Sequence, residues 1–463
     1  MKTGIVGAGI SGLATAQAIL SRDPSAEVTV FEAESHTGGK VLTEITPQGY
    51  LCEWGVNAFL DKVPRTLELC GEIGLDPVSG DASAKKRYVF SEGELHKLPE
   101  KPPEFLTSKL LSVPGRLRVI GEIFSGKTKK PDETLEEFGT RHLGREAFQK
   151  LIDPMASGVF AGDASQMSLQ SCFPRIHEVE SEFGSLIRGL IKLQKKARQE
   201  GQKDTPGPGP GGNLTSFRSG MSVLTDTLTA VLGSRVRVNS PISSISSNGR
   251  QYTLHMADGG TEDFDAVILA APAWAQAGIL QELAPGISGL LSEIQYPAVS
   301  VVCMGYSDQK AAKCMDGFGF LVPSREQRGI LGTVADSNVF PGRAPPGSVL
   351  FRTMIGGARS PHLAEMPDEQ LLDRVQSDLR DIMGLSAEPE FVKIHRHNKA
   401  IPQYLVGHAA RLSEIEEQLK HLPGLILTGN AFRGVSLNDC VLNAMKTAQS
   451  ICAGAGGSEA GKS

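Results

Sequence analysis

The stretch Gly7-Ala8-Gly9-Ile10-Ser11-Gly12 determines how the chain begins to fold. It follows a short strand-like run, Lys2 to Val6, and precedes Leu13 to Leu20, whose apolar residues share one helical face. A second predicted strand, Val28 to Phe31, ends in Glu32. In such a unit the three glycines permit a tight turn, close approach of a pyrophosphate, and packing of helix on strand. The pattern predicts an α/β dinucleotide-binding unit, with phosphate at the helix N-terminus and Glu32 accepting from a ribose hydroxyl.

The next segment indicates which dinucleotide is bound. Gly38-Gly39-Lys40 resembles the Gly-Gly-Arg element that follows the second strand in amine-oxidase-like FAD flavoproteins, with Lys40 at the position of the usual arginine. A nicotinamide-binding unit does not need this element. We therefore expect FAD as the cofactor.

Composition limits the remaining choices. The chain has 463 residues, of which 40% are apolar and 21% charged, so it can bury a large core in roughly three domains. Its formal net charge of -5 does not suggest a nucleic-acid partner. The seven cysteines are scattered without a C-x-x-C pair, which favours free thiols in a reducing compartment. The first strand starts at residue 2, so no targeting peptide is expected before it.

The middle of the chain changes character. Lys86 to Pro99 reads as a hairpin with its turn at Glu92-Gly93, and Arg87 stands at its start. Helical spacing dominates from Leu135 to Ile152 and again from Gly184 to Arg198. The second of these is a basic amphipathic helix, which can either lie on an anionic membrane or pack its apolar side inward. The run 203–212 is rich in Pro and Gly and reads as a linker.

Three motifs suggest chemistry that their surroundings do not support. Gly121 to Thr128 and Gly456 to Ser463 both fit G-x-x-x-x-G-K-[ST], but a phosphate loop needs a strand before it and a helix after it. His395 and His397 share a strand face but lack a carboxylate partner, so we expect no metal site.

The C-terminal half is expected to return to the nucleotide-binding fold. Asp265 to Pro272 reads as a buried parallel strand, and Gly424 to Asn430 as a last strand and turn. Gly434 to Cys440 then opens the final helix, whose N-terminus would face the flavin.

Three further segments carry a resemblance that covers nearly the whole chain. Gly158-Val-Phe-Ala-Gly162-Asp163, Ile401-Pro-Gln-Tyr-Leu-Val-Gly407-His408 and Gly429 to Cys440 resemble signatures of the protoporphyrinogen oxidase family, FAD enzymes of late haem biosynthesis. The resemblance implies a six-electron oxidation of protoporphyrinogen IX to protoporphyrin IX, with O2 reduced to H2O2.

The implied fold class is α/β, with three kinds of domain. A discontinuous Rossmann-like FAD-binding domain would comprise residues 1–80, 214–272 and 425–457. An α+β substrate domain would comprise the hairpin 81–99 and residues 273–424. A helical, membrane-associating domain would comprise 100–213, and 458–463 would form a tail. The implied location is cytoplasmic and peripherally membrane-associated.

The resemblance also assigns individual residues. The apolar residues Leu321, Val334 and Met354 would sandwich the porphyrin rings, and Arg87 would pair with a propionate. No catalytic acid or base and no metal ligand is assigned, since the flavin N5 accepts the hydride; Asn57 is the polar candidate near it. The FAD contacts would be Gly7, Ala8, Gly9, Ile10, Ser11, Gly12, Glu32, Ala33, Lys40, Gly55, Val56, Asn57, Ala58, Val236, Asn430, Val435, Ser436 and Leu437.

Several alternatives remain open. An amine oxidase of the same fold often carries a lysine near N5 and two aromatics, and sometimes a cysteine bonded to FAD. Here Gly429 to Gly434 has one aromatic and no cysteine, and Cys303 stands at the lysine position, which favours non-covalent FAD. Oxidation of coproporphyrinogen III, with four propionates instead of two, is the closer rival. A non-enzymatic flavin-binding membrane module is a third reading, and the sequence leaves open whether the chain forms a homodimer.

Overall fold

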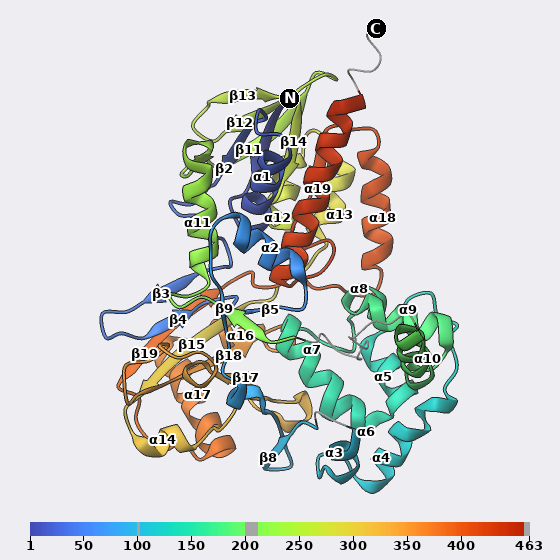
Figure 1. The fold of residues 1–463 in the computed structure, drawn as a ribbon, viewed down its shortest axis with the longest axis vertical. Coiled ribbons are helices and arrows are strands. Elements are labelled where there is room, and N and C mark those ends of the chain that lie inside the picture. Colours follow the sequence, from blue (N-terminus) through green and yellow to red (C-terminus); the bar gives the residue numbers. More distant parts are fainter. Residues whose placement is uncertain (100–101, 200–211, 458–463) are drawn as a thin grey trace.

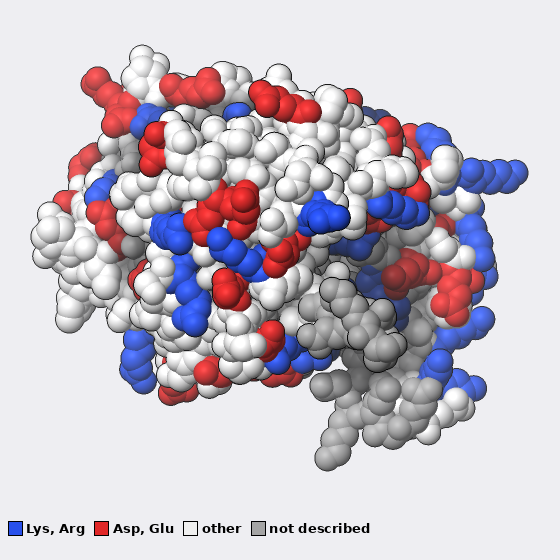
Figure 2. Space-filling view, turned by 90° about the horizontal axis from the view of Figure 1, so that it is seen from above, with Lys and Arg blue, Asp and Glu red and all other residues white. Residues whose placement is uncertain are grey.

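The computed structural model describes residues 1–99, 102–199 and 212–457. A parallel sheet with its helices fills one end of the molecule, a large mixed sheet lies at the other end, and a cluster of helices lies beside that sheet (Figure 1). Residues 203–211 of the predicted linker, the tail 458–463 and most of the second phosphate-loop match lie outside the described part. Acidic and basic side chains intermingle on the face seen from above (Figure 2).

The parallel five-stranded sheet contains the N-terminal motif. Its order is β10-β2-β1-β14-β20, so strands from distant parts of the sequence lie side by side. The expected parallel strand at 265–272 is confirmed as β14, in register with β1 from Thr3–Ala266 to Val6–Leu269. The bounds are β1 Lys2–Val6, β2 Glu27–Phe31, β10 Val236–Arg237, β14 Ala266–Leu269 and β20 Leu425–Leu427.

Both faces of this sheet are buried, which explains its continuous apolar strands. One face packs under α1 (Ile10–Arg22), α2 (Pro64–Glu72), α11 (Ser222–Leu232) and α19 (Leu437–Gly457). The other packs against α12 (Ala273–Leu280), α13 (Pro285–Ser292), α18 (His408–Leu419) and an antiparallel sheet. That sheet comprises β11 (Ile242–Ser247), β12 (Tyr252–Met256) and β13 (Thr261–Phe264).

The larger sheet has seven strands in the order β19-β15-β18-β17-β16-β7-β8. The predicted hairpin is confirmed at its edge, and Glu92 and Gly93 both take positive φ in the turn. One face is covered by α17 (Asp368–Met383). The opposite face packs against residues 50–58 of the nucleotide-binding part. Its strands are β7 Arg87–Ser91, β8 Glu94–Lys97, β15 Val299–Tyr306, β16 Gly319–Leu321, β17 Ile330–Ala335, β18 Val349–Gly356 and β19 Phe391–His397.

The expected helical segment consists mainly of short helices. The spacing over 135–152 continues as a helix only to Leu143, because Gly144 takes φ 88° there and a π-helix follows at Phe148–Ile152. The α-helices are α3 Pro102–Thr107, α4 Val113–Ile120, α5 Leu135–Leu143, α6 Arg145–Ala147, α7 Asp153–Phe160, α8 Leu169–Cys172, α9 Pro174–Phe183 and α10 Leu186–Gln199. Within the described ranges no helix is both long and apolar enough to cross a membrane.

Short elements complete the chain. Two small sheets pair β3 (Thr43–Ile45) with β4 (Leu51–Glu53), and β9 (Leu214–Ser216) with β5 (Phe59–Leu60) and β6 (Val78–Ser79). The short helices are α14 Gln309–Lys313, α15 Asp336–Val339 and α16 Pro361–Ala364.

Candidate functional site

The turn between β1 and α1 has the geometry of a phosphate cradle. Gly7 takes φ +107°, and a Cβ on Gly12 would lie 1.9 Å from the Gly7 carbonyl oxygen. The nearest atom to a hypothetical Cβ on Gly9 is the Gly38 carbonyl oxygen at 3.9 Å, and Gly9 caps α1 without a side chain. The first turn of α1 also lacks an acidic residue, so its N-terminal N–H groups face an open approach that suits an anion.

Glu32 lies at the tip of β2, beside the cradle. One carboxylate oxygen accepts from the Ala8 N–H at 2.8 Å and the other accepts from the Glu34 N–H at 3.1 Å. A carboxylate has further lone pairs. Glu32 therefore anchors the turn and keeps capacity to accept from a ribose hydroxyl.

Two segments distant from the cradle in sequence complete this region. The Gly38 N–H donates to the Ala8 carbonyl at 2.9 Å, which places Gly38-Gly39-Lys40 beside Gly9. A Cβ on Gly55 would lie 2.1 Å from the Lys40 carbonyl oxygen, so residues 55–58 follow directly against that segment. Asn57 then presents a buried Nδ2 without a hydrogen-bond partner.

The N-terminus of α19 approaches the same region. Leu437 and Cys440 pack with Ile10 of α1 in one core, so the two helices begin close together. Ser436 Oγ accepts from the Asp439 N–H at 3.1 Å, and the Asp439 carboxylate accepts from the Ser436 N–H at 3.2 Å. This reciprocal cap fixes the helix start.

The remaining expected cofactor residues occupy the border of this region. Val236 pairs with Val30 on the far side of β2, and Ala33 is exposed just beyond that strand. Asn430 follows β20, and its carbonyl accepts from the Tyr404 hydroxyl at 2.5 Å. Ser11 is buried in the first turn of α1, and Val435 is half-buried ahead of α19.

The expected substrate residues share one face of the seven-stranded sheet. Leu321 and Met354 are both registered with Gly332, and Val334 lies two residues farther along the same strand. Val334 and Met354 pack in one apolar cluster with Ala58 of the expected cofactor segment. Leu321 packs against α7, where a Cβ on Gly158 would lie 2.6 Å from its side chain. The structure thus brings the two predicted sets of residues together.

Arg87 stands at the end of the same row. It is registered with Gly319, which is registered in turn with Val334. The Arg87 side chain is exposed, and its guanidinium lies over the Phe318 ring at 5.5 Å. Within the described residues it has no carboxylate partner.

The comparisons with known proteins identify the family. The profile described as flavin containing amine oxidoreductase matches residues 10–452. The chain belongs to this family. The chloroplastic protoporphyrinogen oxidase of Oryza sativa subsp. japonica is 34% identical over 469 residues, covering 96% of this chain and 87% of the relative. The coproporphyrinogen III oxidase of Bacillus subtilis (strain 168) is 30% identical over 452 residues, covering 94% and 95%.

A solved structure is also similar. A crystal structure of a provisionally named protoporphyrinogen oxidase from Exiguobacterium sp. 255-15 superimposes with a TM-score of 0.81 at 28% identity, over 97% of this chain and 98% of that one. As a member of the flavin-containing amine oxidoreductase family, this chain is a flavin-dependent oxidoreductase.

Sequence reasoning did not anticipate a set of buried ionic groups on the same face of the large sheet as the apolar residues, where Arg352 is registered with Val334. Arg352 Nε donates to the Asp336 carboxylate at 2.8 Å, and Arg343 lies 3.4 Å from Glu53. Burial raises the pKa of the Glu53 carboxyl to about 7 despite that arginine. The sequence around each of these residues does not predict its ion-pair partner, because the partners come from separate strands and loops.

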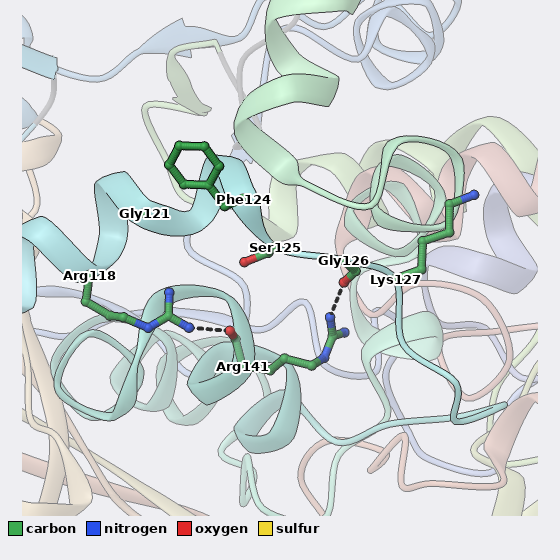
Figure 3. Close-up of a pocket in the computed structure, with 7 residues that line it drawn as sticks. All are labelled: Arg118, Gly121, Phe124, Ser125, Gly126, Lys127 and Arg141. Atoms are coloured by element: carbon green, nitrogen blue, oxygen red, sulfur yellow. Dashed lines mark hydrogen bonds between the residues drawn. The ribbon is translucent and has the colours of Figure 1, made fainter.

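The motifs that suggested other chemistry are not supported as such sites. His395 and His397 are in ring contact at 4.5 Å, but within the described residues no group of three or more His, Cys, Asp or Glu is placed to hold a metal. Gly121 to Thr128 follows helix α4, not a strand. It borders an open hollow of about 440 Å³, where Arg141 donates to the Gly126 carbonyl and Lys127 points away (Figure 3).

Proposed function

We propose that this protein is a porphyrinogen oxidase that uses non-covalently bound FAD to convert protoporphyrinogen IX into protoporphyrin IX, with O2 as acceptor and H2O2 as product. The observation that carries the proposal is the apolar cluster joining Val334 and Met354 to Ala58, with Arg87 at the end of the same row. A flat macrocycle with peripheral carboxylates needs an apolar slot and a cation at its rim.

The residues present fit FAD. The glycine cradle offers N–H groups to the pyrophosphate, Glu32 accepts from the ribose, and the orphaned Asn57 Nδ2 offers a buried donor to the flavin. Residues 1–80, 214–272 and 425–457 would form the FAD-binding domain. The hairpin 81–99 and residues 273–424 would form the substrate domain.

The chain's own residues would bind, orient and shield the substrate. The bound flavin supplies the acceptor for hydride from a meso carbon, three times for six electrons. Leu321, Val334 and Met354 hold the rings against the flavin side and exclude water, while Arg87 fixes the tilt through a propionate. Cys303, at the position of the amine-oxidase lysine, is fully buried within β15, and burial raises the pKa of its thiol.

Coproporphyrinogen III is the second candidate substrate, favoured by the similarity to the Bacillus subtilis relative. Its four propionates would need more cations at the slot than two do. Arg352 is ion-paired with Asp336, and Lys393 with Glu44, on strands of the same sheet. Because these charges are already neutralised, the arrangement favours the substrate with two propionates.

We further propose cytoplasmic, peripheral association with an anionic membrane, through α4 instead of α10. The apolar side of α10 packs inward on α9, where a Cβ on Gly189 would meet Val179 and Phe183 within 3 Å. Of the two arrangements that the sequence left open for α10, its packing therefore favours the one in which the apolar side faces inward. The exposed apolar stripe lies on α4 and the turn after it, at Val113 (60% exposed), Leu117 (64%), Ile120 (47%) and Phe124 (88%).

Charge supports this docking surface. Between residues 105 and 130 the acidic residue is Glu122, which is fully buried. Phe124 projects away from Arg118 and Arg141 (Figure 3). Apolar side chains flanked by cations in sequence are typical of segments that lie at an anionic lipid surface. The basic residues of this stretch are Lys109, Arg116, Arg118, Lys127, Lys129 and Lys130.

The test is steady-state oxidation of both porphyrinogens by the purified, FAD-loaded protein in air, followed by porphyrin fluorescence. Heat-inactivated protein controls for spontaneous oxidation. We expect the larger kcat/KM with protoporphyrinogen IX. A larger value with coproporphyrinogen III would select the second candidate, and oxidation of neither by flavin-loaded protein would overturn the proposal.

A further inference from the structure

A side-chain contact links the cofactor segment to the edge of the large sheet. Lys40 Nζ lies 3.2 Å from His397 Nδ1, although the residues are 357 positions apart. His397 is on β19, and its Nε2 lies 2.8 Å from the Trp54 carbonyl oxygen. The contact therefore joins the Gly-Gly-Lys element to the sheet that carries the expected substrate residues.

The partners define the tautomer of His397. A lysine ammonium can only donate, so Nδ1 must accept, and Nε2 must carry the proton donated to the Trp54 carbonyl. Burial, followed by the nearby Lys40 charge, lowers the pKa of His397 to about 4. The neutral imidazole thus accepts a hydrogen bond from the Lys40 ammonium at Nδ1 and donates one to the Trp54 carbonyl, just before Gly55, from Nε2.

The backbone of Lys40 contacts the cofactor region both before and after this residue. Its backbone follows Gly38-Gly39 beside Gly9 of the cradle, and its carbonyl accepts from the Val56 N–H at 3.4 Å. Its ammonium contacts His397 at the end of β19. Fixing that ammonium therefore fixes the segment between the cradle and residues 55–58.

We propose that His397 is a positioning residue for the flavin cofactor, which acts by holding Lys40 and the Trp54 carbonyl. This inference rests on the proposed FAD site and adds a residue to which nothing else assigns a role. It predicts that the contact slows release of the cofactor and depends on Lys40. Val392 is the control on the same strand, because it lies five positions before His397 and its side chain is 36% exposed.

The test measures FAD release from diluted full-length holoprotein, followed by the rise of free-flavin fluorescence. Loss of a hydrogen bond to a charged group should speed release by about tenfold in His397→Phe. His397→Gln, which can still accept and donate, should recover most of the parent rate. Val392→Ala should release FAD at the parent rate.

A double-mutant cycle separates positioning from general damage. In the Lys40→Met background, His397→Phe should speed release by less than it does in the parent, because only the contact with the Trp54 carbonyl is left to lose. Parent-like release from His397→Phe, or an undiminished effect in that background, would overturn the proposal. If His397→Phe does not fold, the same cycle is run with His397→Asn, too short to reach both partners. A preparation that binds no FAD would refute the proposed function itself, whereas unchanged release from a yellow protein refutes only the role of His397.

Discussion

Replacing Gly12 with alanine tests the phosphate cradle through a clash that the structure defines. The new methyl carbon would lie 1.9 Å from the Gly7 carbonyl oxygen and 3.1 Å from its carbon. Contacts between such atoms settle near about 3.5 Å, so α1 and the turn must separate by about 1 Å or more. The N–H groups aimed at the pyrophosphate move with the helix.

The expected cost follows from the hydrogen bonds that are lost. Each bond from an N–H to a charged phosphate contributes about 1.5–3 kcal/mol, so losing one or two should weaken FAD binding at least tenfold to hundredfold. The assay is titration of FAD into the flavin-depleted protein, followed by quenching of flavin fluorescence. Gly278→Ala in α12 is the matched control, because nothing lies within 4 Å of its added methyl.

The control should keep the parent affinity and tolerate heating at least as well, since alanine favours helix by about 1 kcal/mol over glycine. A Gly12→Ala protein that binds FAD as tightly as the parent would refute the assigned geometry of the cradle. Thermal melting of the flavin-free proteins separates lost affinity from lost folding.

Three further results are expected. Arg87→Ala should raise the KM for protoporphyrinogen about tenfold with the flavin spectrum intact, because an exposed guanidinium–carboxylate pair is partly screened. Arg87→Lys should recover part of this affinity, and Lys86→Ala should change the KM little. Unchanged kinetics in Arg87→Ala would show that Arg87 is a solvated surface residue without a role in substrate binding. Phe124→Ser with Leu117→Ser should reduce flotation with anionic vesicles at low salt, and equal binding to neutral vesicles would contradict the charge argument. Burial lowers the pKa of His408 from 6.5 to about 4, so its contribution to stability is complete above pH 6.5 and is lost as the pH falls toward 4. Measured by urea unfolding, the free energy of unfolding should therefore fall less over that pH range in His408→Gln than in the parent. An equal dependence on pH in both proteins would contradict burial of the neutral ring.

The sequence predicts the elements whose signals are local. The glycine motif, the parallel strand at 265–272 and the hairpin turn at Glu92-Gly93 each depend on backbone conformations or on buried runs within a few residues. These features place the cradle and the edge of the large sheet. Where the backbone takes a conformation that glycine adopts most readily, the glycine in the sequence indicates it without knowledge of the fold.

The features that the sequence does not predict depend on partners. The spacing of α10 shows that one side is apolar but not that α9 covers it, and the exposed stripe of α4 is visible only once its surroundings are known. The contact of Lys40 with His397 and the buried Glu53–Arg343 pair join residues from separate elements. Such contacts are set by how the sheets pack against each other.

The proposed function requires a flavin in this fold to oxidise a porphyrinogen directly, and the anaerobic half-reaction isolates that step. The holoprotein is mixed with protoporphyrinogen IX under anaerobic conditions in a stopped-flow instrument, and the flavin absorbance band is followed. We expect rapid bleaching of the oxidised flavin on substrate addition and its return when O2 is admitted. A flavin that stays oxidised while fully loaded with substrate would contradict the proposed function.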